Sequence, residues 1–558
     1  MKLWTCVLVV CAAVCVACGQ QPASDEDWLE LDTPQGPVRG RKDPEADHLY
    51  VFYNIPYATA PVNENKFKPP LPPPTWSKPF NAVDEFVICP QSLPDKGGDK
   101  LKKFVSKEDC LIANIYVPDT PAKNLSVLVY IHGGGFGMGY GNINKAKHFL
   151  EKKDVVLVNF NYRLGVHGFL CLGTEDIPGN AGIKDQVALL RWVQNNIASY
   201  GGNPNDVTVA GFSAGSVSVD LLMLSKLAEG LFHKAIPESG GNLAVFAIQR
   251  NPLAIARSQA RRLNFTGVDD ISALEQFYKT APMSVLISNL RFERPDFNNF
   301  FSPCVERETA KEPFLTESSL SLLQKGSFKK IPILYGFANM EGLLRIRQFE
   351  TWKVKMNEKF SVFLPIDLKF KTAKEKKEVA EQIKKFYFGD KPVGNDNILE
   401  YISFYSDLFA FHPMLWAVKL RVEAGHKEIY LYDYSFVDED TPVVPHTNVR
   451  GADHCAQTMA LMDGRNGLDY DESNLTTEFR NMKKIIREIW HNFVKTGKPV
   501  PEGSSLPAWP ATGANWAPSM SLGQMVELRE EPLLQNHTNF WQDIYQKHYR
   551  DPIPPPKA

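Results

Sequence analysis

Short apolar runs rich in β-branched residues alternate along the chain with longer stretches of helical character. Residues 126–132, 154–162, 206–212 and 331–337 have the length and composition of buried strands. Residues 181–200, AGIKDQVALLRWVQNNIASY, have the composition of a helix between two such strands. Strands that alternate with helices favour a mainly parallel sheet covered by helices on both faces. The pattern therefore predicts an α/β fold.

A lysine-rich segment in the second half of the chain changes this picture little. In residues 369–386, KFKTAKEKKEVAEQIKKF, glutamates are interleaved with the lysines and the apolar residues keep a helical spacing. This pattern indicates an amphipathic surface helix rather than a basic binding patch. We find no internal repeat and no low-complexity linker, and only the final PIPPPK has the composition of an unstructured tail. We therefore expect residues 20–558 to form one catalytic domain.

The N-terminal residues MKLWTCVLVVCAAVCVACGQQ have the features of a secretory signal peptide. One lysine precedes an apolar core over residues 3–16, and the small residues Ala17 and Gly19 suit cleavage after Gly19. The core is shorter than the roughly 20 residues that span a bilayer, which disfavours an uncleaved anchor. Lipidation of Cys18 is a weaker alternative, because no leucine stands where a bacterial lipobox requires one. We expect residues 1–19 to be removed and the product to be secreted without a membrane anchor.

Charge and composition exclude some classes of partner. The 558 residues include 62 Lys and Arg and 64 Asp and Glu, for a formal net charge of −2. This balance gives no electrostatic reason to expect nucleic acid or an anionic membrane as a partner. With 44% hydrophobic residues the chain can bury a large core, as a large single-domain enzyme does. A small neutral substrate fits this composition better.

Secretion affects how the cysteines are interpreted. Four of the nine lie within residues 1–19, so five remain, and at least one thiol stays free in an oxidising compartment. Cys89 and Cys110 are the closest pair and flank a polar loop, so we expect a disulfide between them. Cys171, Cys304 and Cys455 show neither CxxC spacing nor clustered histidines, which argues against a metal site of the zinc type. Their pairing is left open.

Four Asn-X-Ser/Thr sequons predict positions on surface loops that are glycosylation candidates. They are Asn124, Asn264, Asn474 and Asn536.

The stretch VTVAGFSAGSVSVDLLML, residues 207–224, places Ser213 between two glycines where a predicted strand meets a predicted helix. This is the context of a nucleophile elbow, in which glycines leave room for a sharp, strained turn that lifts the hydroxyl clear of the sheet. An ordinary turn containing serine and glycine also matches GxSxG, so this motif alone does not assign a role to Ser213.

A second glycine motif, HGGGF at residues 132–136, directly follows the predicted strand SVLVYI. Backbone N–H groups can approach a developing alkoxide only where no side chain intervenes, so a glycine-rich loop here suits an oxyanion hole. A phosphate-binding loop fits less well, because no Gly-Lys-Ser/Thr follows. We expect the N–H groups of Gly134, Gly135 and Ala214 to be the oxyanion donors.

A nucleophilic serine needs a base and an acid that orients the base. In α/β-hydrolases the acid and then the histidine follow the serine, each on a loop after a later strand. Glu341, in ILYGFANMEGLL, stands just past a predicted strand, and His454, in VRGADHCAQ, stands in a loop after the strand-like EIYLYDYSF. Glu350 or Asp367 are alternative acids, and His446 is an alternative base.

The chain resembles the type-B carboxylesterases of the cholinesterase-like α/β-hydrolase family over residues 38–541. The motifs that carry the resemblance occur in the family's order: FYNIPYATAPV, EDCLIANIYVP, HGGGF, NYRLGVHGF, PGNAGIKDQVALLRWVQNNIASYGGNP, GFSAGS, ANMEG, GADH and WHNFVKTGKP. The resemblance implies an α/β-hydrolase fold with a central, mostly parallel sheet flanked by helices. It also implies an enzyme that hydrolyses a small-molecule ester without a metal or organic cofactor.

The resemblance also assigns roles to residues. It implies that Ser213 is the nucleophile, Glu341 the acid and His454 the base. It implies the same three oxyanion donors as above, and the pair Cys89–Cys110 matches the family's first disulfide.

The chain departs from the family at several positions. Phe212 precedes the serine where members often carry Glu, and Gln457 stands where many carry Asp or Glu three residues after the histidine. Asn264 or Phe265 stands near the place of a cysteine of the second disulfide of vertebrate members, which makes that bond doubtful here. GFSAG, GADHCAQ and the signal peptide are most similar to secreted insect esterases, especially moth antennal and integument esterases thought to clear odorants and pheromone esters.

The sequence therefore predicts a secreted serine carboxylesterase for neutral esters, such as acetate-ester odorants, pheromones or xenobiotic esters. A juvenile hormone esterase is one alternative, although those enzymes commonly carry GQSAG and Phe212 counts against it. A catalytically silent adhesion relative of the same fold is a second alternative, although such proteins generally lack the serine and carry a membrane anchor. A lipid-acting lipase is a third.

Overall fold

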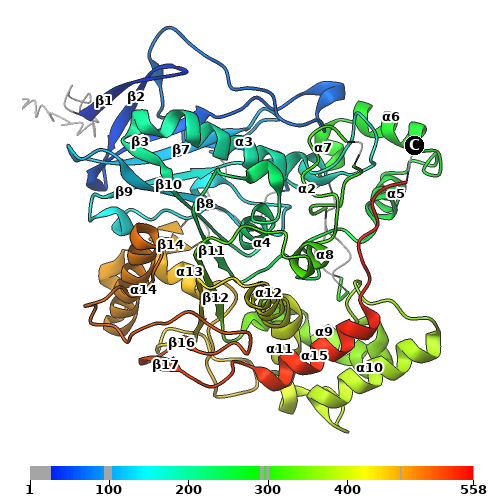
Figure 1. Ribbon diagram of the computed structural model, residues 1–558. Coiled ribbons are helices and arrows are strands. Elements are labelled where there is room, and N and C mark those ends of the chain that lie inside the picture. Colours follow the sequence, from blue (N-terminus) through cyan, green and yellow to red (C-terminus); the bar gives the residue numbers. More distant parts are fainter. Residues whose placement is uncertain are drawn as a thin grey trace, which may run out of the picture.

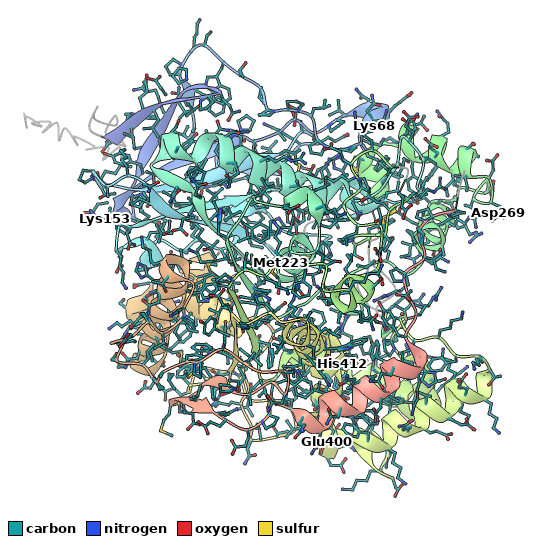
Figure 2. All side chains as sticks on the ribbon, viewed as in Figure 1. Lys68, Lys153, Met223, Asp269, Glu400 and His412 are labelled. Atoms are coloured by element: carbon teal, nitrogen blue, oxygen red, sulfur yellow. A yellow bond between two sulfur atoms is a disulfide. The ribbon has the colours of Figure 1, made fainter. Side chains whose placement is uncertain are left out.

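The computed structural model describes residues 27–92, 103–288, 294–296, 301–308, 310–465, 468–469 and 471–556. The expected signal peptide, residues 1–19, lies outside the described residues. Side chains fill the space between the helices and the sheet, and the labelled Met223 lies buried at the end of α4 (Figure 2).

A large twisted sheet runs through the molecule (Figure 1). Within the described residues it has 13 strands in the order β1-β2-β3-β7-β9-β8-β10-β11-β12-β13-β16-β17, with β4 paired to β2. The central strands from β9 and β8 through β16 run parallel, and the strands at both edges run antiparallel. The strands are β1 (Trp28–Thr33), β2 (Gly36–Asp43), β3 (Ala46–Pro56), β4 (Phe80–Asn81), β7 (Ile112–Pro118), β8 (Leu125–Ile131), β9 (Val155–Phe160), β10 (Gly202–Phe212), β11 (Lys234–Glu238), β12 (Ile333–Ala338), β13 (Ile429–Tyr434), β16 (Ser519–Leu522) and β17 (Val526–Arg529).

Helices cover both faces of the sheet (Figure 1). Where the structure describes the chain, two further pairs of short strands lie outside this sheet: β5 (Val87–Ile88) with β6 (Val105–Ser106), and β14 (Gly464–Arg465) with β15 (Leu468–Asp469). The helices are α2 (Gly165–Phe169), α3 (Ala181–Asn196), α4 (Ala214–Leu222), α5 (Pro252–Arg262), α6 (Ile271–Thr280), α7 (Met283–Leu286), α8 (Ser319–Gln324), α9 (Phe349–Lys359), α10 (Ala373–Phe388), α11 (Ile398–Ser406), α12 (His412–Glu423), α13 (Ala456–Leu461), α14 (Thr477–Thr496) and α15 (Gln535–His548).

The central strand β8 shows why the predicted strands are apolar without alternation. Its residues Val127 and Val129 belong to the core on the face covered by α3, α4 and α12. Leu128 and Tyr130 belong to the core on the opposite face, which α14 covers. A strand buried on both faces has a continuous apolar sequence. The α/β fold predicted from the sequence is confirmed, and its four predicted strands correspond to β8, β9, β10 and β12.

The predicted helices are present with shifted ends. Residues 181–200 form α3 and a 3₁₀ turn, Ile197–Tyr200. The amphipathic surface helix predicted from residue 369 begins later, as α10 at Ala373, because the side chain of Thr372 caps it by accepting the N–H of Glu375 at 3.1 Å. Within α10, Val379 and Ile383 are buried. No helix among the described residues has the length and apolar character needed to cross a membrane.

The C-terminal tail is ordered, so the prediction of an unstructured PIPPPK is wrong for its described part. In Figure 1 the red tail runs from α15 to the region of α5. The N–H of Ile553 donates to the carbonyl of Arg250 at 3.1 Å, and Nε of Arg307 donates to the carbonyl of Pro555 at 3.0 Å. Pro552 and Pro555 are buried. These partners lie far away in the chain, so the local composition did not reveal them.

The sequons have exposed asparagines, as expected of glycosylation candidates, but one is not in a loop. Asn124 and Asn264 lie in turns and Asn474 in a 3₁₀ turn, whereas Asn536 lies in α15. The expectation of a surface loop is wrong at Asn536.

Among the cysteines that the structure describes, four form two disulfides and the buried Cys455 is free. One joins Cys89 to Cys110. The other joins Cys171 to Cys304, a pairing that the sequence had left open.

We predict that loss of the Cys171–Cys304 bond destabilises the protein more than loss of the Cys89–Cys110 bond. The first bond closes 133 residues and the second only 21. The chain-entropy model makes the longer cross-link worth about 1.5 kcal/mol more. Guanidinium unfolding of the two double Cys→Ala variants under non-reducing conditions measures the difference. A less stable Cys89→Ala/Cys110→Ala variant would contradict the expectation.

Candidate active site

Ser213 stands in a strained turn between β10 and α4. Its φ of 56° and ψ of −121° lie in a region that residues with a side chain rarely adopt. The N–H of Ser213 stabilises this turn by donating to the carbonyl of Glu238 at 2.9 Å. A Cβ on Gly215 would lie 2.1 Å from the carbonyl oxygen of Ile131, so only glycine lets α4 approach β8 this closely. The two glycines around Ser213 thus serve the packing of the elbow.

The structure brings together the three residues that the resemblance singled out. Nε2 of His454 lies 3.0 Å from Oγ of Ser213, and Nδ1 of His454 lies 2.5 Å from Oε2 of Glu341. Glu341 is completely buried, and its other carboxylate oxygen accepts the N–H of Ala338 at 2.9 Å. The carboxylate therefore accepts a hydrogen bond from Nδ1–H of His454, which leaves Nε2 unprotonated and able to accept the serine proton.

The alternative acids and base lie elsewhere. Nε2 of His446 is 3.2 Å from Oε1 of Glu350, so these two form an exposed pair with each other. Asp367 is buried, accepts the hydroxyl of Tyr545 at 3.0 Å and lies 3.4 Å from Nη2 of Arg250. These contacts place all three alternatives outside the group around Ser213.

The glycine loop after β8 has the backbone conformation that the oxyanion interpretation requires. Gly134 and Gly135 have φ of 105° and 60°. The carbonyl of Gly134 accepts the N–H groups of Gly137 and Met138, both at 3.1 Å, which makes the loop a tight turn. Ala214 is the first residue of α4, where a helical N–H has no partner within the helix. The N–H of Ala214 therefore has no partner within α4, as expected of an oxyanion donor.

The side chain of His132, the first residue of the loop, forms a hydrogen bond back to the loop. The ring is buried, stacks on Tyr162 with centroids 4.4 Å apart, and donates from Nδ1 to the carbonyl of Gly133 at 2.8 Å. Burial lowers the pKa of His132 to about 4. The ring is therefore neutral at physiological pH and adds no charge next to the oxyanion position.

Phe212, which departs from the family pattern, packs behind the same loop. Its ring is stacked at 6.3 Å from that of Tyr130, and a Cβ on Gly133 would lie 2.7 Å from it. An apolar ring thus lies between the glycine loop and β8.

An aromatic pair that the sequence analysis missed lies next to the base. Phe409 meets the ring of His454 edge to face, with centroids 4.7 Å apart, and stacks on Phe246 at 4.6 Å. Phe409 belongs to a π-helical turn, Asp407–Phe411, that joins α11 to α12. Such turns are frequent at functional sites but have no local sequence pattern. The pair excludes water from one side of the imidazole.

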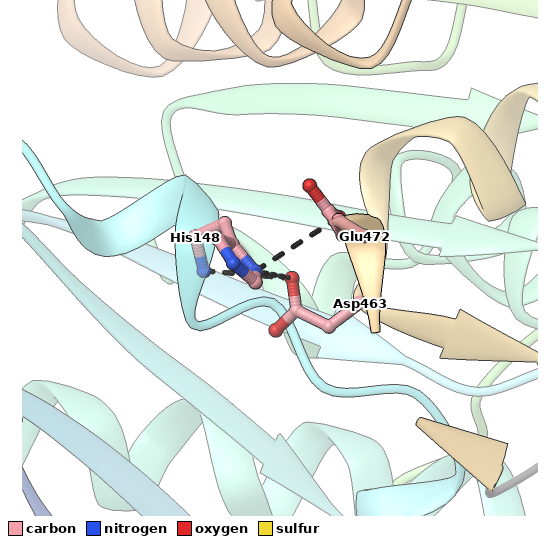
Figure 3. A group of neighbouring side chains, drawn as sticks. All are labelled: His148, Asp463 and Glu472. Atoms are coloured by element: carbon pink, nitrogen blue, oxygen red, sulfur yellow. Dashed lines mark hydrogen bonds and ion pairs between the residues drawn. The ribbon is translucent and has the colours of Figure 1, made fainter. Parts of the chain in front are cut away.

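A separate group of side chains has the donor types of a metal site. His148, Asp463 and Glu472 offer ligand atoms that all lie within 4.8 Å of one another (Figure 3). However, Nη2 of Arg487 lies 2.5 Å from Glu472 and 3.3 Å from Asp463. Nζ of Lys483 lies 3.2 Å from Glu472. Because two cations already balance the two carboxylates, we interpret this group as an ion-pair network that ties the segment after the glycine loop to α14.

Comparisons with known proteins match nearly the whole chain. The family model described as "Carboxylesterase family" matches residues 27–541. Esterase FE4 of Myzus persicae is 31% identical over 478 residues, which cover 82% of this chain and 82% of that protein. Juvenile hormone esterase of Tribolium castaneum is 31% identical over 517 residues, which cover 87% of this chain and 86% of that protein.

A solved structure is similar over nearly the whole chain. The crystal structure of juvenile hormone esterase from Manduca sexta, with OTFP covalently attached, superposes with a TM-score of 0.81 at 29% identity. The match covers 93% of this chain and 100% of that one.

We predict that His454→Gln abolishes turnover of 4-nitrophenyl acetate while His446→Gln leaves it within about twofold. Of the two histidines, His454 is the one that contacts Ser213, and glutamine in its place cannot take up the serine proton. His446→Gln is the matched control, because it makes the same change on an exposed histidine. Steady-state kinetics of both variants decide the point, and the reverse order of activities would reassign the base.

Proposed function

The chain belongs to the carboxylesterase family, has the α/β-hydrolase fold and is a carboxylic-ester hydrolase, and from this we propose that Ser213, His454 and Glu341 carry out the hydrolysis. The observation that carries the proposal is the continuous contact from Glu341 through His454 to Ser213, at 2.5 Å and 3.0 Å. A catalytically silent relative would not need to keep this alignment. The geometry therefore favours an active enzyme.

The proposed reaction passes through an acyl-enzyme. Nε2 of His454 takes the proton of Ser213 as Oγ attacks the ester carbonyl carbon. The N–H groups of Gly134, Gly135 and Ala214 stabilise the negative oxygen of the tetrahedral intermediate. The intermediate expels the alcohol, which receives the proton from His454. A water molecule then attacks the acyl-enzyme with His454 again as base, the acid leaves and the serine is restored.

Glu341 has an electrostatic role in both halves of the reaction. Its carboxylate holds Nδ1–H and so keeps the imidazole in the tautomer whose Nε2 accepts a proton. When the ring becomes positively charged, the buried carboxylate lies 2.5 Å away and stabilises that charge. The N–H of Ala338 keeps the carboxylate in place.

We propose neutral esters as the substrate class, with acetate-ester odorants, pheromones or xenobiotic esters as examples. The groups next to the site that support this are apolar. Phe409 packs against one side of His454 and stacks on Phe246, and Phe212 replaces the carboxylate that family members often carry before the serine. The loop closed by Cys89–Cys110 contains only Phe104 as an aromatic residue, so it lacks a tryptophan to bind a quaternary ammonium.

Juvenile hormone esterase activity is a second candidate. Its support is the similarity to the juvenile hormone esterases of Tribolium castaneum and Manduca sexta. The chain is about equally similar to these two enzymes and to Esterase FE4 of Myzus persicae, with identities of 31%, 29% and 31%. Sequence identity therefore does not favour juvenile hormone over other esters as the substrate. Phe212 counts against this candidate.

We further propose that the protein is secreted and that residues 20–558 form a single catalytic domain. The N-terminal sequence supports removal of residues 1–19. The two disulfides and the four exposed sequon asparagines fit an oxidising, glycosylating compartment.

We predict that Ser213→Ala lowers kcat by on the order of 10⁴-fold or more, because it removes the hydroxyl that contacts Nε2 of His454. The variant should stay folded, since alanine removes only the hydroxyl. Kinetics with 4-nitrophenyl acetate and a thermal melt measure both properties. Retention of kcat within tenfold of the unchanged protein would refute the assignment.

We predict a higher kcat/KM for 3,3-dimethylbutyl acetate than for acetylcholine, its cationic isostere. The site offers apolar surface, on which each buried CH₂ contributes roughly 0.8 kcal/mol. It lacks two groups that would attract a cation, a tryptophan in the Cys89–Cys110 loop and a carboxylate at the position of Phe212. By the same reasoning a medium-chain alkyl acetate should exceed acetylcholine. Competition between the matched esters at one pH and ionic strength measures the preference. Faster hydrolysis of acetylcholine would exclude the neutral-ester interpretation.

A further inference from the structure

A row of three residues crosses the sheet beneath the active site. Glu238 at the end of β11 is in register with Gly336 of β12, and Gly336 is in register with Tyr432 of β13. The phenol of Tyr432 passes over the middle strand, and its hydroxyl donates to the carboxylate of Glu238. A Cβ on Gly336 would lie 1.9 Å from the ring of Tyr432, so this contact depends on glycine in the middle position.

The same carboxylate holds the helix that follows the catalytic histidine. Oγ1 of Thr458, in the first turn of α13, donates to Oε2 of Glu238 at 2.6 Å. Beside it, Nε2 of Gln457 donates to Oγ of Ser239 at 2.6 Å. Thr458 comes only four residues after His454 in the chain. Glu238 and the next residue, Ser239, therefore bind two consecutive residues of α13.

Glu238 also binds the nucleophile through its main chain. Its carbonyl accepts the N–H of Ser213 at 2.9 Å, the bond that supports the strained turn. The side chain of Glu238 thus fixes the segment that carries His454, while its backbone fixes Ser213. Glu238 is therefore in contact with both the nucleophile and the helix that follows His454.

The environment of Glu238 is costly for a carboxylate. The residue is completely buried, and burial raises its pKa to about 7. The titratable groups that face it are Tyr432, Tyr130, Cys455 and Glu341. A buried carboxylate is tolerated when hydroxyl donors compensate it, and Tyr432 and Thr458 supply two. An apolar residue would avoid this cost but would leave α13 without its anchor.

We propose that Glu238 is a positioning residue that, through Thr458, holds His454 at the distance from Ser213 needed for proton transfer. This inference rests on the proposed function, because it assigns Glu238 a role in the reaction of the same site. It requires that the contact act on turnover and not only on the stability of the fold.

Removal of the Thr458 hydroxyl tests the inference with the smallest change of shape. Thr458→Val should lower kcat for 4-nitrophenyl acetate about tenfold with KM within about twofold, because misplaced reacting groups slow the chemical step more than binding. Thr458→Ser keeps the hydroxyl and should restore kcat to within about threefold of the unchanged protein. Thr208→Val is the matched control, since its buried hydroxyl has no partner and it lies on β10. It should leave kcat unchanged.

A double variant tests whether Glu238 and Thr458 act together. If Thr458 acts through Glu238, the double variant Glu238→Leu/Thr458→Val should lose no more activity than Glu238→Leu alone, because leucine cannot form a hydrogen bond with Thr458. Circular dichroism and thermal melts confirm that each variant compared is folded.

The outcomes separate this inference from the proposed function. If the protein without substitutions shows no esterase activity that depends on Ser213, the proposed function is refuted. With that activity present, an unchanged kcat in Thr458→Val, an equal loss in Thr208→Val, failure of Thr458→Ser to restore kcat, or additive losses in the double variant would overturn the role of Glu238.

Discussion

The hydrogen bond between Glu341 and His454 joins residues 113 positions apart, and the candidate active site depends on it. It forms because β12 and β13 are parallel neighbours, so the loops after their carboxyl ends leave the same edge of the sheet. Ser213 follows β10, and β11 lies between β10 and β12, so the nucleophile leaves the same edge. Sheet topology thus brings together groups that the sequence keeps far apart.

The site contains a strained backbone turn and a buried carboxylate, and backbone hydrogen bonds stabilise both. Ser213 adopts an unfavourable backbone conformation, and Glu341 is a carboxylate without solvent contact. Each is stabilised by a backbone contact, from Ser213 N–H to the carbonyl of Glu238 and from Ala338 N–H to Glu341. Strained and buried polar groups persist only where the surrounding structure over-determines them. The sheet, buried on both faces, provides that rigidity.

The sequence predicted the features that depend on local pattern. Buried strands show as β-branched runs, and the strained turn at Ser213 and the tight glycine loop after β8 show as glycines next to strands. Local pattern did not choose between His454 and His446 or among Glu341, Glu350 and Asp367, because that choice depends on which loops meet; the family resemblance made it. The pairing of Cys171 with Cys304, the ordered tail and the π-helical turn of Phe409 also depend on distant contacts. No window of the sequence contains both partners of these contacts.

The central claim is that the strained turn presents Ser213 as an activated nucleophile. The most direct test treats the purified protein with a fluorophosphonate and maps the modified residue by peptide mass spectrometry. The account predicts stoichiometric labelling of Ser213, with loss of esterase activity in proportion to the label. Labelling of a different residue, or full labelling of Ser213 with activity retained, would contradict it.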